Sequence, residues 1–260
     1  MTLLLEGRVA VITGSASGIG RMGAIVFAQE GAKVIIADIN HQRGQEVVSL
    51  IREQGNEASF IPADMLVVAD IERLIREAVD TYGRLDIFWH NAGIIGPDRI
   101  ENITEETYDN MMTVHLKAGV FGAKFAVPEM RKVGGGCILF TSSVGGLKQS
   151  GYSLTYSLAK TGLVMLTKKL AVDLAKDNIR VNCICPGRVE TQMRVSIAEQ
   201  RARAMSIDLE EWGRRDRQRI PMGRYITEEE VADGALFLVS DRASAITGVA
   251  LPIDGGFLAV

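Results

Sequence analysis

The chain has 260 residues, of which 47% are hydrophobic, enough for one large α/β domain with a sizeable core. Its formal charge is −3 and its pI is about 5.7, which argues against nucleic acid or an anionic membrane surface as a partner. No stretch reaches the ~18 consecutive apolar residues of a membrane span, and the first residues lack the charged start of a signal peptide, so we expect a cytoplasmic protein.

Short apolar runs alternate with helical patterns from residue 9 to residue 184. The runs predict strands at 9–13, 33–37, 58–61, 85–89, 137–141 and 180–184. The helical patterns predict a helix that ends at Ala28 and further helices at 41–53, 68–82, 105–131 and 156–175. This order, with short connections, predicts an α/β fold: one doubly wound parallel sheet with helices on both faces, in a single domain over 1–260.

The three cysteines, Cys137, Cys183 and Cys185, lie in apolar, strand-like stretches. Cys-x-Cys without a nearby histidine is poor spacing for metal ligands. We therefore expect buried core cysteines and no metal site.

A glycine-rich turn follows the first expected strand, with Gly14, Gly18 and Gly20 at its corners. Glycine lets the backbone approach a pyrophosphate, which the N-terminus of the next helix attracts. The spacing, Gly-x-x-x-Gly-x-Gly, differs from the common Gly-x-Gly-x-x-Gly fingerprint. Asp38 closes the second strand, where a carboxylate can accept hydrogen bonds from ribose hydroxyls and repel a 2′-phosphate; it could also simply cap a helix. Together the two features predict a dinucleotide site.

Tyr156 and Lys160 are four residues apart in an expected helix, so their side chains share one face. A free tyrosine ionises near pH ~10, too high for a base at neutral pH. A neighbouring ammonium favours the phenolate and lowers that value. The pair therefore suits proton transfer to or from an alcohol oxygen.

These motifs, in this order, resemble the short-chain dehydrogenases/reductases from about Gly7 to the C-terminus. The segments that carry the resemblance are Thr13-Gly14-x-x-x-Gly18-Ile19-Gly20, Asp64, Asn91-Ala92-Gly93, Ser143 with Tyr156 and Lys160, Pro186-Gly187 with Thr191, Ile246-Thr247-Gly248 and Asp254-Gly255-Gly256. The resemblance implies a Rossmann-like fold and hydride transfer to or from a nicotinamide coenzyme. It assigns Ser143, Tyr156 and Lys160 to catalysis.

The resemblance also implies a set of coenzyme-binding positions. They are Gly14, Ser17, Gly18, Ile19, Gly20, Asp38, Ile39, Asp64, Met65, Asn91, Ala92, Gly93, Tyr156, Lys160, Pro186, Gly187, Val189 and Thr191. Members that use NADP often carry Arg or Lys just before the second motif glycine or just after the second strand. This chain has Ser17 and Asp38-Ile39 at those places, which favours NAD.

One position departs from the family pattern. Where the family usually has an asparagine that holds a water in the proton relay, this chain has His115. Histidine can donate and accept hydrogen bonds and titrates near neutral pH. We hypothesise that His115 replaces the asparagine in the relay; the alternative is a packed histidine satisfied by backbone. His41 and His90 read as helix-start and strand-end residues without a chemical role.

The expected substrate is a secondary alcohol or the matching ketone. The walls predicted around it, Gly93, Ile94, Ile95, Gly145, Leu147 and Tyr152, carry little charge, which favours a hydrophobic, cyclic or terpene-like compound. Residues 188–219 leave the strand–helix rhythm and correspond to the family's variable substrate lid. Alternatives are a 3-oxoacyl thioester or polyol ketone reductase and, in another class, an inactive NAD-sensing protein. Family members are usually homotetramers or homodimers.

Overall fold

The computed structural model describes residues 3–96, 99–149 and 153–260. The strands are β1 (Val9–Thr13), β2 (Lys33–Asp38), β3 (Ala58–Pro62), β4 (Ile87–His90), β5 (Gly136–Thr141), β6 (Ile179–Pro186) and β7 (Ala250–Ile253). The helices are α1 (Gly18–Gln29), α2 (His41–Glu53), α3 (Val68–Tyr82), α4 (Glu105–Met112), α5 (Ala118–Lys132), α6 (Leu154–Leu174), α7 (Gln192–Met205), α8 (Leu209–Arg217) and α9 (Glu228–Val239). The expected strands and helices up to residue 184 are confirmed to within a few residues, except in one helix.

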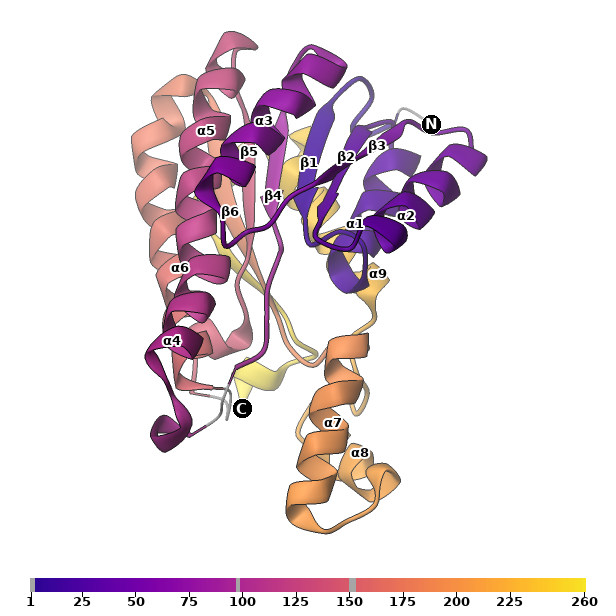
Figure 1. Cartoon of the computed structure of the whole chain (residues 1–260), viewed down its shortest axis with the longest axis vertical. Coiled ribbons are helices and arrows are strands. Elements are labelled where there is room, and N and C mark those ends of the chain that lie inside the picture. Colours follow the sequence, from indigo (N-terminus) through magenta and orange to yellow (C-terminus); the bar gives the residue numbers. More distant parts are fainter. Residues whose placement is uncertain (1–2, 97–98, 150–152) are drawn as a thin grey trace.

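The seven strands form one parallel sheet in the order β3-β2-β1-β4-β5-β6-β7 (Figure 1). Connections from β1 run outward to β2 and β3, and from β4 they run the other way to β7, so the order reverses between β1 and β4. In doubly wound sheets, ligands bind beyond the carboxyl ends of the strands at such a reversal. The topology therefore places a cleft next to the ends of β1 and β4.

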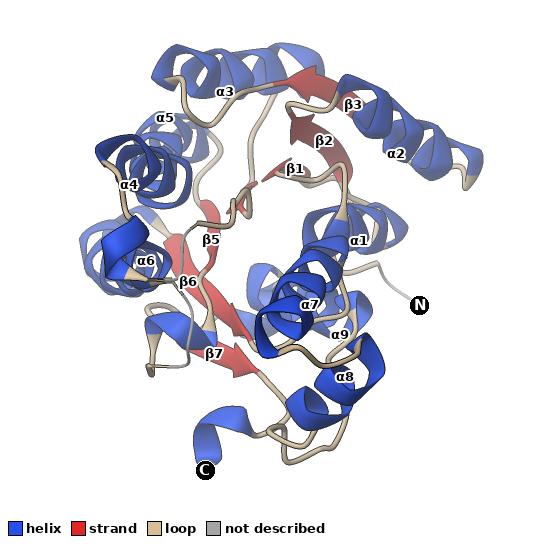
Figure 2. Cartoon of the chain, turned by 60° about the horizontal axis from the view of Figure 1, so that its bottom comes forward, coloured by secondary structure: helices blue, strands red, loops and turns tan. Residues whose placement is uncertain are grey.

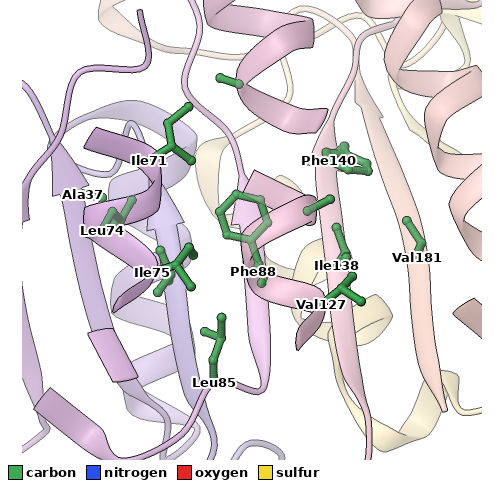
Figure 3. Packing of buried hydrophobic residues seen from close by; sticks show 14 of the residues in the cluster. Ala37, Ile71, Leu74, Ile75, Leu85, Phe88, Val127, Ile138, Phe140 and Val181 are labelled. Carbon is green, nitrogen blue, oxygen red and sulfur yellow. The ribbon is translucent and has the colours of Figure 1, made fainter. Parts of the chain in front are cut away.

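Helices cover both faces of the sheet, as Figures 1 and 2 show. On one face α3, α5 and α6 enclose a core cluster that includes Phe88, Ile138 and Phe140 (Figure 3). On the other face α1, α2 and α9 pack over a second cluster that includes Phe27 and Trp89. Because the strands are buried on both faces, their sequences are continuous apolar runs rather than alternating apolar and polar residues. The fold is the α/β doubly wound sheet that the sequence predicts.

The helix expected at 105–131 is helical from Glu105 to Lys132, but it contains a π-helical turn that the sequence did not predict. α4 ends at Met112, and a π-helical turn, Thr113–Lys117, joins it to α5. The amide of Ala118 bonds the carbonyl of Thr113, five residues back, so one extra residue is accommodated in this turn. Hydrophobic periodicity does not reveal such a turn, because the residues on both sides of it keep a helical pattern.

Residues 188–219 form α7 and α8, a helical pair that projects beyond the carboxyl edge of the sheet (Figure 1). A small cluster of Ala198, Ala202 and Trp212 joins the two helices. The buried Asp216 carboxylate pairs with Arg188 and Arg194 and links α8 to the segment that leaves β6. In the part of the chain that the structure describes, no helix combines the length and the apolarity needed to cross a membrane.

Candidate active site

A cavity of about 500 Å³ opens beyond the carboxyl ends of the strands. All the site residues predicted from the sequence line it, with one exception: Gly14, Ser17, Gly18, Ile19, Asp38, Ile39, Asp64, Met65, Asn91, Ala92, Gly93, His115, Ser143, Tyr156, Lys160, Pro186, Gly187, Val189 and Thr191. The exception is Gly20, which is buried behind the turn. Residues spread over nearly 180 positions therefore meet in one place because the ends of parallel strands share one edge.

The glycine turn after β1 is packed too tightly for side chains. Gly14 has φ +64°, and a Cβ there would lie 2.7 Å from the Cα of Ala92. A Cβ on Gly20 would lie 2.4 Å from the carbonyl oxygen of Gly14 and 2.6 Å from Nδ2 of Asn91. Both neighbours are held by the sheet, so they have little freedom to move. The close packing brings the backbone of the turn and the N-terminus of α1 to the cavity, where Ser17 at the N-cap makes no side-chain capping bond.

Two carboxylates lie at the ends of neighbouring strands: Asp38 is the last residue of β2, and Asp64 comes two residues after β3. Asp38 accepts hydrogen bonds from the amides of Ala16 (3.1 Å) and Asn40 (2.9 Å), which fix its carboxylate at the cavity wall. Asp64 accepts from the amide of Leu66 at 2.8 Å. Asp38 is not the N-cap of α2; Asn40 is, through its bond with the amide of Arg43. The capping alternative for Asp38 is therefore wrong.

Asn91 is held between β1 and β5. Its Nδ2 donates to the carbonyl of Gly14 (3.2 Å), and its Oδ1 accepts from the hydroxyl of Thr141 (3.1 Å). The indole of Trp89 donates to the same Thr141 hydroxyl at 2.8 Å. Asn91 thus ties the glycine turn to the strand that leads to Ser143.

The expected Tyr–Lys pair lies on one face of α6. Nζ of Lys160 is 5.4 Å from the ring centroid of Tyr156 and donates to the carbonyl oxygen of Thr141 at 2.6 Å. Ser143 follows β5, and its Oγ accepts from the amide of Gly145 at 3.1 Å. The hydroxyl of its neighbour Ser142 donates to the main-chain carbonyl of Lys160, which fixes the serine segment to α6. All three predicted catalytic side chains therefore face one cavity.

Lys160 is only 3% exposed, and this burial lowers its pKa from the ordinary 10.5 to about 7. The nearby thiols of Cys185 and Cys183 partly oppose the lowering of the Lys160 pKa. A lysine with this pKa can lose or regain its proton near neutral pH.

The three cysteines are buried, as expected, and form no disulfide with one another.

His115 lies in the π-helical turn and is 1% exposed. Its ring packs edge-on against Tyr156, with centroids 5.3 Å apart. Nε2 lies 3.1 Å from the amide nitrogen and 3.0 Å from the carbonyl oxygen of Ile94, so one of these bonds forms in either neutral tautomer. Nδ1 is buried and has no hydrogen-bond partner among the described residues. A Cβ at Gly93 would lie 2.6 Å from this ring, so glycine is what admits a histidine here.

Burial, helped by the positive charge of Lys160, lowers the pKa of His115 well below 6.5. The expectation that His115 titrates near neutral pH is therefore wrong. The ring is a neutral imidazole at physiological pH and can act only as a neutral donor or acceptor.

Some lining residues were not predicted from the sequence, and some predicted ones lie elsewhere. Of the expected substrate walls, Gly93 and Ile94 line the cavity, Ile95, Gly145 and Leu147 do not, and Tyr152 lies outside the described residues. The lining residues without a sequence prediction are Ala63, Leu66, Asn110, Val114, Thr141 and Ser142, whereas Gln192, Arg194 and Ile197 belong to the segment 188–219 that was expected to lie over the substrate. Helical spacing could have grouped some of these residues, since Asn110 and Val114 are four residues apart, and Arg194 and Ile197 are three apart.

These features fit a dinucleotide coenzyme. The turn at Gly14 leaves no room for a Cβ, a helix N-terminus faces the cavity, and Asp38 presents an anchored carboxylate where a ribose would be recognised.

Comparisons with known proteins agree with this geometry. The family model described as enoyl-(acyl carrier protein) reductase matches residues 14–258. An uncharacterized oxidoreductase of Thermotoga maritima is 43% identical, over 98% of this chain and 99% of that protein. The 2,5-dichloro-2,5-cyclohexadiene-1,4-diol dehydrogenase of Sphingobium indicum is 37% identical over 97% of each.

Solved structures give the same result. Levodione reductase superposes with a TM-score of 0.94 at 32% identity, over 98% of this chain and 99% of that one. The L-sorbose reductase of Gluconobacter frateurii, crystallised with NADPH and L-sorbose, has a TM-score of 0.94 at 32% identity over the whole of both chains. Site, sequence and structure thus lead to one conclusion: the chain belongs to the short-chain dehydrogenase/reductase family and is an oxidoreductase of that type.

Proposed function

We propose that the protein is an NAD-dependent oxidoreductase that interconverts a secondary alcohol and a ketone. The observation that carries the proposal is the shared cavity. Asp38 ends β2 on one side of the β1/β4 reversal, and Ser143, Tyr156 and Lys160 lie on the β5 side of it. One ligand can therefore contact a ribose-binding carboxylate and a proton-transfer group at the same time.

The coenzyme would be held by residues at the carboxyl ends of neighbouring strands. The Gly14 turn and the first amides of α1 suit its pyrophosphate, Asp38 suits the adenosine ribose, and Asn91 shapes the wall between them. When bound, the nicotinamide accepts or donates the hydride. The protein supplies position and the proton.

The preference for NAD rests on Asp38. Among the described residues that line the cavity, Lys160 and Arg194 are the only Lys or Arg side chains, and neither belongs to the β2 end. A carboxylate fixed by two amides would repel a 2′-phosphate, and Ile39 beside it offers no compensating charge. Because the similar L-sorbose reductase was crystallised with NADPH, the choice between NAD and NADP is the first property of this chain to measure.

In the direction of oxidation, Tyr156 would take the proton of the substrate hydroxyl as hydride leaves the carbon that bears this hydroxyl. Lys160 would stabilise the phenolate by its charge and contact the nicotinamide ribose. Its ammonium already donates to the Thr141 carbonyl, so it is held beside Tyr156 without an acidic partner among the interactions described. Ser143 would donate a hydrogen bond to the substrate oxygen and align it with Tyr156.

We propose that His115 takes part in the relay as a neutral imidazole. Its partnerless Nδ1 can hold a water in either tautomer, because Nε2 then bonds the carbonyl or the amide of Ile94. If His115→Leu left kcat unchanged, the relay role would be refuted, whereas His115→Asn installs the residue usual in the family and should keep the relay.

We propose a hydrophobic cyclic alcohol as the substrate. The lining of the cavity includes the apolar side chains of Ile94, Val114 and Ile197. The Sphingobium relative is named for a cyclic diol, a substrate of the same kind. Residues 188–219 would act as the lid, since Arg194 and Ile197 of α7 already reach the cavity.

The test is NADH formation by purified protein, with NAD and NADP run separately. The alcohols should span cyclohexanols, bicyclic terpenes, steroids, sugars, short aliphatics and 3-hydroxyacyl thioesters. Turnover of cyclic alcohols with NAD supports the proposal. Preference for NADP with the thioester supports the 3-oxoacyl reductase alternative, and NAD binding without any turnover supports the sensor alternative.

We also propose a homotetramer or homodimer formed through α5 and α6. Val120, Met165 and Val172 are exposed apolar residues on these two helices, and Val172 is 79% exposed. Light scattering after size exclusion would report the mass, and a monomer would refute this assembly.

A further inference from the structure

His90, the last residue of β4, is a fully buried histidine whose two ring nitrogens both have partners. Nδ1 lies 3.1 Å from the hydroxyl oxygen of Thr13, and Nε2 lies 3.1 Å from the main-chain carbonyl oxygen of His115. The sequence suggested no chemical role for this residue. These contacts link strand β1, strand β4 and the π-helical turn, which lie 77 and 25 residues apart along the chain.

The partners determine where the proton of His90 lies. A carbonyl only accepts, so Nε2 carries the hydrogen and donates it to the carbonyl of His115. The Thr13 oxygen already accepts from the amides of Asn91 and Ala92, both at 3.1 Å, so its own hydrogen is available to Nδ1. Each donor in the network then has an acceptor, provided that His90 is neutral. Burial, assisted by the charge of Lys160, lowers the pKa of His90 to about 4, in agreement with a neutral ring.

The carbonyl that His90 binds belongs to the π-helical turn. The bond to this carbonyl therefore ties the turn directly to the end of β4. The same residue, His115, directs its ring to Tyr156 and Ile94. The hydrogen bond from His90 holds the main chain of His115 and therefore limits the positions that the His115 ring can take.

We propose that His90 is a positioning residue that holds the π-helical turn to the end of β1 and thereby seats the His115 ring against Tyr156. The proposal rests on the proposed function, because it concerns the position of the His115 ring beside Tyr156, the proposed proton-transfer group. It also makes Thr13 a link between the two halves of the site. The hydroxyl of Thr13 fixes His90, and the next residue, Gly14, begins the coenzyme turn.

Two amide substitutions separate the two contacts of His90. In His90→Asn the amide reaches about as far as Nδ1, so it can keep the Thr13 bond and loses the His115 carbonyl. In His90→Gln the amide nitrogen reaches about as far as Nε2, so it can keep the bond to the His115 carbonyl. His90→Leu keeps neither and retains an apolar filling of the core.

We expect kcat to fall by about tenfold or more in His90→Asn and His90→Leu, since displacements of ~1 Å near reacting groups can lower rates ~100-fold. His90→Gln should recover most of the rate, and KM for NAD should change less than kcat in all three. Equal losses in Asn and Gln, or losses that only follow the melting temperature, would overturn the proposal.

A measurement without turnover keeps this test separate from the proposed function. The chain has three histidines, so nitrogen NMR of the imidazoles can be assigned with His41→Gln and His115→Asn. We expect His90 of the unmodified protein as the neutral Nε2–H tautomer, and a displaced His115 resonance in His90→Asn but not in His90→Gln. A His90 that is protonated at Nδ1, or a His115 resonance indifferent to both variants, would refute the positioning role even in an enzyme whose substrate is still unidentified.

Discussion

Lys160→Met is predicted to stabilise the coenzyme-free protein while it removes turnover. The ammonium of Lys160 is buried, and its pKa falls from 10.5 to about 7. Each pKa unit corresponds to about 1.4 kcal/mol, so the charge destabilises the fold at pH 7 by roughly 4–5 kcal/mol relative to a lysine left in water. Methionine fills a similar volume but leaves the Thr141 carbonyl without its donor, which costs about 1–3 kcal/mol. The expected net gain in the free energy of unfolding at pH 7 is about 2 kcal/mol.

The pH dependence gives the sign independently. An unfolded chain keeps the lysine proton up to pH ~10.5, whereas the folded protein releases it near pH 7. Between these values the unfolded state binds more protons, so the stability of the unmodified protein rises with pH because of Lys160. Below pH 7 this contribution is constant and unfavourable. The advantage of Lys160→Met should therefore shrink as the pH increases from 7 towards 10.

The assay is urea unfolding of both proteins without coenzyme, from pH 6 to 10. Lys168→Met is the matched control, since Lys168 is an exposed lysine on the same helix and its loss should change little. Titrating groups remote from Lys160 cancel in the difference between variants. A Lys160→Met protein that is less stable at pH 7, or a difference that does not change with pH, would refute the reasoning.

Three further predictions concern the coenzyme turn and the proton-transfer group. Tyr156→Phe should lower kcat by about 10²–10⁴-fold while the dissociation constant of NADH, measured by fluorescence, changes little; substantial turnover would exclude Tyr156 as the proton-transfer group. Asp38→Asn keeps an acceptor for the Ala16 or Asn40 amide but removes the charge, so the ratio of kcat/KM for NADP to that for NAD should rise about tenfold or more, and an unchanged ratio would show that Asp38 does not select the coenzyme. Gly20→Ala would put a methyl group 2.4 Å from the Gly14 carbonyl, so we expect a loss of about 1–3 kcal/mol in unfolding free energy together with weaker NADH binding, and calorimetry showing neither would contradict the packing argument.

The sheet and most of the site could be predicted because their signals are local. A strand buried on both faces is a short apolar run, and a turn that excludes Cβ atoms must contain glycine. A short segment of sequence is therefore enough to predict both β1 and the role of Gly14. The i, i+4 spacing of Tyr156 and Lys160 likewise places both on one face without knowledge of the rest of the fold.

The features that sequence reasoning missed depend on contacts between distant segments. The π-helical turn and the neutral state of His115 follow from what the turn packs against, since burial among Ile94, Tyr156 and Lys160 determines its protonation. The Thr13–His90 link joins residues 77 positions apart, so no pattern around either one could reveal it. Helices α7 and α8 depend on a buried Arg–Asp–Arg cluster as well as on a small apolar cluster, and the sequence indicated only that residues 188–219 leave the strand–helix rhythm.

The strand order has a consequence for how the chain reaches its native state. Strands β3, β2, β1 and β4 all lie within the first 90 residues, so this half of the sheet can pair while the rest of the chain is still being synthesised. Strand β4 then waits for β5, whose last residue is Thr141; at about 5–20 residues per second the delay is roughly 3–10 s. During that time β4, with Phe88 and Trp89, presents an unpaired apolar edge of the kind that recruits other strands. We therefore expect the nascent protein to be prone to aggregation at this edge between the completion of β4 and the pairing of β5.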